Sequence, residues 1–255
     1  IVPCGFSTFR EALRAGCEVY HMLGKLLRAA GKSVGVGDEG GFAPDMRDNS
    51  EVLSMLRDAV ENAGYTTEQI RFAMDAASSE WTEGDSKYTL PKAGGTMDSV
   101  DLIAVYESLA KRFPILSLED GLGEDDDSGW KSMTERLGKE MLLVGDDFFV
   151  TNPAKLKKGI ERGLANAILV KPNQIGTLTE TMEVVRMAKN AGYHTILSHR
   201  SGETDDTTIA DLAVGMGTGY IKTGAPCRGE RTAKYNRLLA IEEELANGAR
   251  YGSGF

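Results

Sequence analysis

Six ionisable side chains stand where short apolar runs of the sequence end. An apolar run that ends in a charged residue is typical of a buried parallel strand whose carboxyl end opens onto a site. Because such strand ends meet on one face of a barrel, we expect these side chains to converge although they are far apart in sequence. The six are Asp75, Glu119, Asp146, Lys171, His199 and Lys222.

Lys171 follows the aliphatic run 167–170 and precedes a proline. At the mouth of a site, low-dielectric walls and nearby cations would favour the neutral amine, which can act as a general base. The alternative interpretation is a lysine that extends from a strand end into solvent. The local sequence leaves both open.

Three consecutive predicted strands end in the carboxylates Asp75, Glu119 and Asp146. Three crowded anions are costly unless a hard cation neutralises them, and oxygen ligands of this kind suit Mg²⁺. Each acid could instead cap the helix that follows it. The acidic run 124–127 is different, because it does not end a strand, and we expect a solvated loop or a helix start there.

The later strand ends offer positive charge and hydrogen-bond donors. Arg200 and Ser201 follow His199, and Lys222 lies on the last predicted strand, where barrels often bind phosphate. A substrate that carries both phosphate and carboxylate would fit these groups. The alternative for Arg200 is a structural ion pair with Glu203.

These residues require a scaffold of alternating strands and helices. From residue 71 onward, six strand–helix units follow one another, which predicts a parallel sheet with its helices outside. A short strand at 1–3 raises the count to seven, one fewer than a closed eight-stranded (β/α) barrel. The expected strands are 1–3, 72–75, 115–119, 142–146, 167–171, 194–198 and 220–223, and the expected helices are 8–27, 50–64, 98–112, 130–137, 153–162, 177–191, 207–216 and 231–245.

Composition limits the class of protein. The 255 residues are 41% hydrophobic and 26% charged, which suits one large or two modest domains. A net charge of −9 argues against general nucleic-acid binding. Three cysteines without metal-ligand spacing, Cys4, Cys17 and Cys227, indicate small buried side chains in a reducing compartment. No apolar run reaches membrane-spanning length, and no signal peptide is recognisable.

The glycine-rich segment 35–44 contains a G-x-G-x-x-G match. That pattern indicates dinucleotide binding only between a hydrophobic strand and a helix. Here the residues before it are polar and Phe42-Ala43-Pro44 follows, so we expect a loop that carries the carboxylate of Glu39. His21 and His194 are expected to be packing or surface residues.

Seven segments in order resemble the enolase family from one end of the chain to the other. They are Val36–Gly41, Met74–Glu80, Leu118–Asp120, Gly145–Asp147, Leu169–Thr177, Ser198–Thr204 and Ile221–Pro226. The resemblance implies a TIM-type (β/α)8 barrel and the reversible, Mg²⁺-dependent dehydration of 2-phosphoglycerate to phosphoenolpyruvate in glycolysis. It also implies two magnesium ions in each site, a homodimer and a cytoplasmic location.

The resemblance implies a role for each site residue. Lys171 would be the general base and Glu39 the general acid, with crowding among carboxylates raising the pKa of Glu39. Asp75, Glu119 and Asp146 would hold one Mg²⁺, and the second would bind with the substrate. The substrate-binding residues would be His199, Arg200, Ser201 and Lys222.

The chain departs from the family at its beginning. The smaller α+β domain, the first barrel strand, and a segment with a further histidine and glutamate have no counterpart in residues 1–255. We therefore interpret 1–255 as a barrel domain that is incomplete at its N-terminus. We expect the isolated chain to have little activity and to associate.

Two other functions are weighed against this one. The chain could be a non-catalytic binding or scaffold protein, as some enolase-like proteins act at cell surfaces, in a secreted pool or in RNA-processing assemblies; intact Lys171, Glu39 and metal acids argue against that role. It could also be a racemase or cycloisomerase of the wider superfamily, but those lack the segments 37–41 and 198–204.

Overall fold

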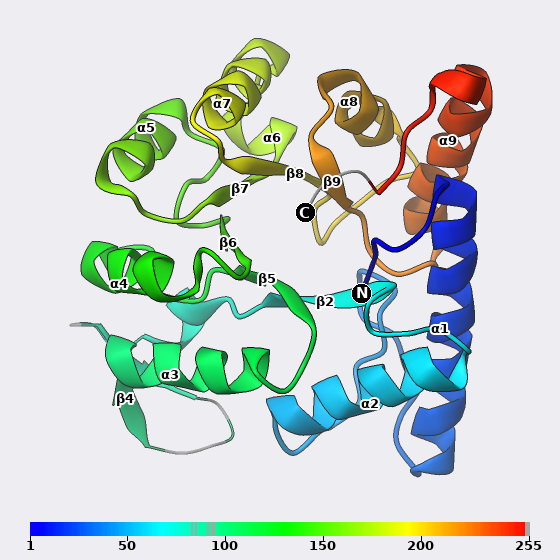
Figure 1. The fold of residues 1–255 in the computed structure, drawn as a ribbon, viewed down its shortest axis with the longest axis horizontal. Coiled ribbons are helices and arrows are strands. Elements are labelled where there is room, and N and C mark those ends of the chain that lie inside the picture. The colour runs from blue at the N-terminus through cyan, green and yellow to red at the C-terminus, as the bar shows by residue number, and fades with distance from the viewer. Residues whose placement is uncertain (83, 85, 91, 93–94, 253–255) are drawn as a thin grey trace. The chain divides into compact units, whose positions relative to one another are not determined.

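The computed structural model describes residues 1–82, 84, 86–90, 92 and 95–252. Its backbone divides into two compact units. The first contains Ile1–Arg71, His199–Gly217 and Ile221–Phe255, and the second contains Phe72–Ser198 and Thr218–Tyr220. Figure 1 labels their elements. No helix among the described residues combines the length and apolar character that crossing a membrane requires.

Parallel strands form the sheet of the second unit. Their order is β2, β5, β6, β7, β8, with β9 next to β8. Asp75 pairs in register with Glu119, and Glu119 with Val144, so neighbouring strands end at the same edge. The bounds are β2 Ile70–Asp75, β5 Ile115–Glu119, β6 Leu142–Gly145, β7 Ala167–Val170, β8 His194–Ser198 and β9 Gly219–Lys222; β2 and β9 each pass from one unit into the other.

Strand β7 is buried along its whole length, as its unbroken aliphatic run predicts. Ala167 and Leu169 pack with Leu142 and Val144 of β6, and Ile196 and Tyr220 pack against this group. Full burial of a Leu, Ile or Val side chain contributes about 1.5–3 kcal/mol. The chain can therefore hold a lysine at the end of β7 without losing the strand.

The helices of the second unit lie on one side of these strands (Figure 1). Short polar residues cap the N-termini of these helices. The side chain of Asn152 accepts backbone N–H bonds at the start of α5, and that of Thr177 does so at the start of α7. The bounds are α3 Ser99–Ala110, α4 Asp127–Leu137, α5 Pro153–Arg162, α6 Pro172–Ile175 and α7 Leu178–Asn190, with a 3₁₀ turn η1 at Ser78–Trp81 and a hairpin of β3 Lys87–Thr89 and β4 Thr96–Asp98.

The first unit is mainly helical. Its core joins Ala210 of α8 to Leu238 and Ile241 of α9, with Phe9 of α1 and Ile221 packed against them. Helices α1 and α9 pack side by side (Figure 1). The bounds are β1 Val2–Pro3, α1 Phe9–Ala29, α2 Asn49–Asn62, α8 Thr208–Met216, α9 Gly229–Leu245 and a 3₁₀ turn η2 at Ala246–Gly248.

The direction of the first strand differs from the parallel series that the sequence predicts. β1 pairs antiparallel with the start of β2, Val2 opposite Arg71 and Pro3 opposite Ile70. Two helices, α1 and α2, separate these strands. One crossover helix returns the chain to the same end of a sheet, whereas a second helix leaves it at the other end and reverses the next strand.

Other differences concern element boundaries and short elements. Helix α2 is capped by Asp48, not Ser50, and α4 begins at Asp127 under the cap of Asp126. Asp126 is buried and accepts bonds from Tyr88 and Ser99, so it is a helix start but not solvated. Helix α6 and the β3–β4 hairpin are too short to give a periodic signal.

Candidate functional site

The strand-end carboxylates of the second unit stand on neighbouring strands. Asp75 and Glu119 are register partners, and Asp146 follows the last residue of β6, the next strand. Glu119 and Asp146 are buried, whereas Asp75 is exposed and one of its oxygens accepts the N–H of Ala77 at 3.1 Å. Asp75 does not cap the short turn η1, whose N-cap is Ala77 and has no side-chain cap bond.

Lys171 turns towards this edge of the sheet. Its Nζ lies 2.5 Å from Oδ2 of Asp146, and only 15% of the lysine side chain is exposed. The Lys171 N–H donates to Oγ1 of Thr151 at 2.9 Å, and Thr151 is fully buried. A lysine held in this way does not extend into solvent, so the alternative from the sequence is wrong.

One oxygen of Asp146 fits a cation ligand. Oδ2 pairs with Lys171, but Oδ1 is buried and has no hydrogen-bond partner among the described residues. A buried carboxylate oxygen without a donor is costly unless a cation or a water molecule binds it. The strand-end carboxylates Asp75, Glu119 and Asp146 offer only oxygen atoms as ligands, which is the ligand type that Mg²⁺ prefers.

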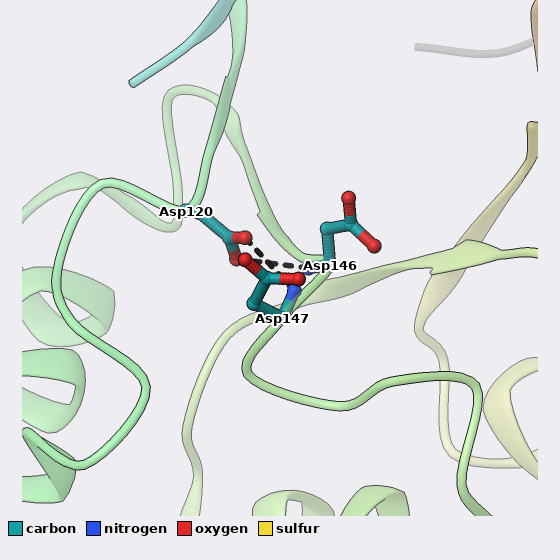
Figure 2. Close-up of side chains that lie close together, drawn as sticks. All are labelled: Asp120, Asp146 and Asp147. Atoms are coloured by element: carbon teal, nitrogen blue, oxygen red, sulfur yellow. Dashed lines mark hydrogen bonds between the residues drawn. The ribbon is translucent and has the colours of Figure 1, made fainter. Parts of the chain in front are cut away.

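Asp120, Asp146 and Asp147 also lie close together, with one ligand atom of each within 4.8 Å of the others. Both oxygens of Asp120 accept backbone N–H groups, from Asp146 at 2.9 Å and from Asp147 at 2.8 Å. Figure 2 shows these bonds running to backbone nitrogens and not to the carboxylate of Asp146. Asp120 therefore holds the loop that presents Asp146.

The backbone around Asp120 is specialised for this task. Asp120 has φ +42°, in the left-handed region, and its side chain is buried. Burial raises the pKa of Asp120 to about 7, and the charges of Asp146 and Asp147 add to the effect. Sequence reasoning missed this residue; the signal was the doubled acid in Glu119-Asp120 and Asp146-Asp147.

In the first unit, Glu39 lies on a closed glycine-rich loop. Val36 and Phe42 form an antiparallel bridge, and the next helix, α2, begins only at Asn49, so no helix opens across the loop as a dinucleotide-binding turn requires. Gly40 has φ +79°, and a Cβ at that position would lie 2.5 Å from the carbonyl oxygen of Cys227. The Glu39 carbonyl accepts the N–H of Ala225 at 2.9 Å. The position of Glu39 is thus fixed by its backbone.

His199 faces Glu39 and is almost fully buried. Its Nε2 lies 3.4 Å from Oε2 of Glu39, and its Nδ1 lies 2.6 Å from Nη1 of Arg231. A guanidinium can only donate, so Nδ1 must accept and the ring proton belongs on Nε2. His199 therefore presents an N–H to the Glu39 carboxylate. Arg231 was not identified from the sequence.

The surroundings of Glu39 within its unit are cationic. The contact with Nε2 of His199 lowers the pKa of Glu39 to about 2, against the raising effect of burial, and the charges of Lys222 and Arg231 add to the lowering. The expectation that crowded carboxylates raise this pKa is wrong for the first unit. In this arrangement Glu39 is ionised at neutral pH.

The segment after His199 is tied to its neighbours through the backbone. The His199 N–H donates to the Lys222 carbonyl at 2.9 Å, and the Arg200 N–H donates to Oε1 of Glu203 at 3.0 Å. Glu203 also pairs with Lys234 at 2.8 Å. Glu203 thus contacts the backbone of Arg200 and the amine of Lys234. Ser201 is exposed.

The three cysteines and the two other histidines form none of the side-chain contacts described above for Glu39, Lys171 and Asp146. Cys4, Cys17 and Cys227 are free thiols, but they are half-buried and not fully buried as expected. His21 and His194 are exposed, as predicted for surface residues.

The parallel strands and the helices that follow them are the elements of a (β/α)-barrel protein, and ionisable residues stand at the strand ends. A sequence model of the enolase C-terminal TIM barrel domain matches residues 1–254. The enolase of Rubrobacter xylanophilus is 56% identical over 252 residues, which are 98% of this chain and 58% of that protein. The chain therefore belongs to the enolase family and spans a little over half the length of this relative.

Proposed function

We propose that the protein catalyses the reversible, Mg²⁺-dependent dehydration of 2-phosphoglycerate to phosphoenolpyruvate, as a hydro-lyase of glycolysis and gluconeogenesis. The observation that carries the proposal is the amine of Lys171, held 2.5 Å from a carboxylate whose other oxygen has no hydrogen-bond partner among the described residues. That pairing supports a base that would work next to a cation ligand. Family membership supports the same reaction.

Lys171 is the proposed general base. The proton on C2 of 2-phosphoglycerate is next to a carboxylate and is therefore very weakly acidic. A buried amine is a suitable acceptor once it is neutral, and removing an amine from water favours that form. The contact with Asp146 holds the amine of Lys171 in place at the carboxyl end of the strands.

Asp75, Glu119 and Asp146 would hold the first Mg²⁺, and the second would bind with the substrate phosphate. When bound, the ions supply positive charge that stabilises the dianionic carboxylate formed as the C2 proton leaves. The buried, unpartnered oxygen of Asp146 supports this ligand set. Asp120 is the less suitable ligand, because both of its oxygens already accept backbone N–H groups.

Glu39 is the proposed partner of the departing C3 hydroxyl. In dehydration a protonated Glu39 gives its proton to that oxygen, and in hydration the carboxylate takes a proton from water. The low pKa of Glu39 suits the hydration direction directly. An anionic substrate would neutralise Lys222 and so raise that pKa, which prepares Glu39 for dehydration.

Arg200 and Ser201 are proposed to bind the phosphate, Lys222 the substrate carboxylate, and His199 to line the pocket. A guanidinium and an exposed hydroxyl are suited to phosphate oxygens. The family also supports a homodimer and a cytoplasmic location, and roles at cell surfaces or in RNA-processing assemblies would be secondary.

The proposal is tested by following the ultraviolet absorbance of phosphoenolpyruvate formed from 2-phosphoglycerate and Mg²⁺, with the protein in the form that its source produces. We expect Lys171→Ala and Glu39→Gln each to lower kcat by about 10²–10⁴-fold. Lys157→Ala changes an exposed lysine of α5 and should leave kcat unchanged. Full activity in Lys171→Ala would disprove the role of the base.

Isotope exchange separates the two roles. If Lys171 removes the C2 proton before Glu39 acts, the Glu39→Gln protein still exchanges that proton with deuterated water although dehydration is lost. The Lys171→Ala protein loses both. Loss of exchange in both variants would contradict the separate assignment.

A further inference from the structure

Helix α9 carries two cations that are buried completely. Arg231 and Lys234 lie one turn apart on the same face, and neither has measurable exposure. A buried cation is costly, and replacing a buried ion pair with apolar residues of similar volume is often neutral or stabilising. The presence of both Arg231 and Lys234 on one turn therefore indicates a role other than packing.

Arg231 joins the loops that carry Glu39 and His199. Its Nη2 donates to the carbonyls of Asp38 at 3.0 Å and Ser201 at 2.7 Å. Its Nη1 donates to the Arg200 carbonyl at 2.8 Å and to Nδ1 of His199 at 2.6 Å. The last bond leaves the ring proton on Nε2, the nitrogen that faces Glu39.

Lys234 holds a different part of the same unit. Its Nζ donates to Oε2 of Glu203 at 2.8 Å, to the Thr204 carbonyl at 2.5 Å and to the Glu230 carbonyl at 2.7 Å. The other oxygen of Glu203 accepts the N–H of Arg200. Lys234 thus reaches the backbone of Arg200 through one carboxylate, and its hydrogen bonds among the described residues go to Glu203, Thr204 and Glu230.

We propose that these two cations are positioning residues with separable tasks, a proposal that rests on the function proposed above. Arg231 sets the tautomer and place of His199 and thereby the proton transfer at Glu39. Lys234, through Glu203, sets the place of Arg200 and thereby the binding of the substrate phosphate. One turn of α9 would then organise both halves of the chemistry assigned to the first unit.

The kinetic test uses Arg231→Lys, which keeps the charge but cannot donate in the planar, forked geometry of a guanidinium. We expect kcat to fall at least about tenfold while KM changes less than about threefold. The double variant Lys234→Met with Glu203→Gln removes the ion pair without leaving a bare charge. It should raise KM at least about tenfold and leave kcat within about threefold.

Arg237→Lys is the matched control on the same helix. Arg237 pairs at the surface with Asp211 and Glu244, and among the described residues it bonds to neither loop. It should change neither constant. If both test variants lower kcat and raise KM to the same extent, the proposal is overturned, because that result would indicate general disruption of the unit.

A second measurement does not depend on turnover. Nitrogen-15 NMR of the unmodified protein should show the His199 proton on Nε2, and Arg231→Lys should mix the tautomers. A proton on Nδ1 in the unmodified protein would refute the role of Arg231. If the protein does not convert 2-phosphoglycerate, the proposed function fails, while this result still decides whether Arg231 sets the tautomer.

Discussion

Among single residues, the local environment and not the residue type decides what each carboxylate can do. Asp120 and Asp146 are both buried acids at strand ends. Asp120 accepts two backbone N–H groups, so it is a structural acceptor, whereas Asp146 pairs with an amine through one oxygen and keeps the other unpartnered among the described residues. The same residue type thus serves as a support in one place and as a candidate ligand in the other.

The ionisation of Glu39 predicts a pH dependence of stability. Its pKa is about 2 in the folded chain, below the ordinary value of 4.5, chiefly because Nε2 of His199 faces its carboxylate at 3.4 Å. Between these values the unfolded state binds more protons, so stability rises with pH there and is lost as pH falls from about 4.5 towards 2. In Glu39→Gln this contribution is absent.

Urea unfolding at about pH 6 and about pH 3 checks this prediction. The unmodified protein should lose more unfolding free energy over that interval than Glu39→Gln does. Glu124→Gln alters an exposed glutamate and should behave like the unmodified protein. Identical pH dependence in the unmodified protein and Glu39→Gln would show that the His199 contact does not act on Glu39.

Asp120→Asn tests the structural role of that carboxylate. An amide keeps one acceptor oxygen but turns its NH₂ group towards the second backbone N–H, so one bond is lost and two donors meet. We expect a loss of about 1–3 kcal/mol in unfolding free energy, measured with urea. Asp125→Asn changes an exposed acid of the neighbouring loop and should cost nothing measurable. Equal stability of the two variants would refute the role.

At the scale of elements, the sequence predicts whatever depends on local patterns. The buried run 167–170, the cap at Thr8 and the strand-end acids all appear where periodicity and capping rules place them. The antiparallel direction of β1 depends on two consecutive helices, and no local pattern reports it. Arg231 in α9 looks like any helical arginine, because its importance arises from loops far away in sequence.

Gly40 is the place where the loop of Glu39 depends most on a single residue. Gly40→Ala would combine a left-handed backbone with a Cβ 2.5 Å from the Cys227 carbonyl oxygen. Gly192→Ala is the control, since Gly192 has a similar φ of +76° but no atom near the added Cβ. Backbone strain should cost about 1–2 kcal/mol of unfolding free energy in both variants. Overpacking should cost about 1–3 kcal/mol more in Gly40→Ala alone. Equal unfolding free energies in urea would show that the loop can move away.

At the scale of the molecule, the charge near Glu39 is opposite in sign to the net charge of the chain. The chain carries −9, yet the cations Lys222 and Arg231 act on Glu39 within its unit. An anionic substrate therefore needs this local positive field, and its attraction should weaken with salt. The sequence predicted the residue types from strand ends, but the cationic surroundings of Glu39 required the folded loop.

The behaviour of the 255-residue chain on its own follows from its sheet. The strand order ends with β1, which has two residues, and with β9, and each is paired on one side among the described residues. Unpaired strand edges promote association, and the chain covers 58% of the Rubrobacter xylanophilus enolase. We expect the isolated 255-residue chain to self-associate in sedimentation experiments and to form little or no phosphoenolpyruvate. Fusing to the chain the portion of the Rubrobacter xylanophilus enolase that lies outside the match should reduce association and raise turnover. A monodisperse, fully active 255-residue monomer would contradict the prediction, because it would mean that the two edges need no partner.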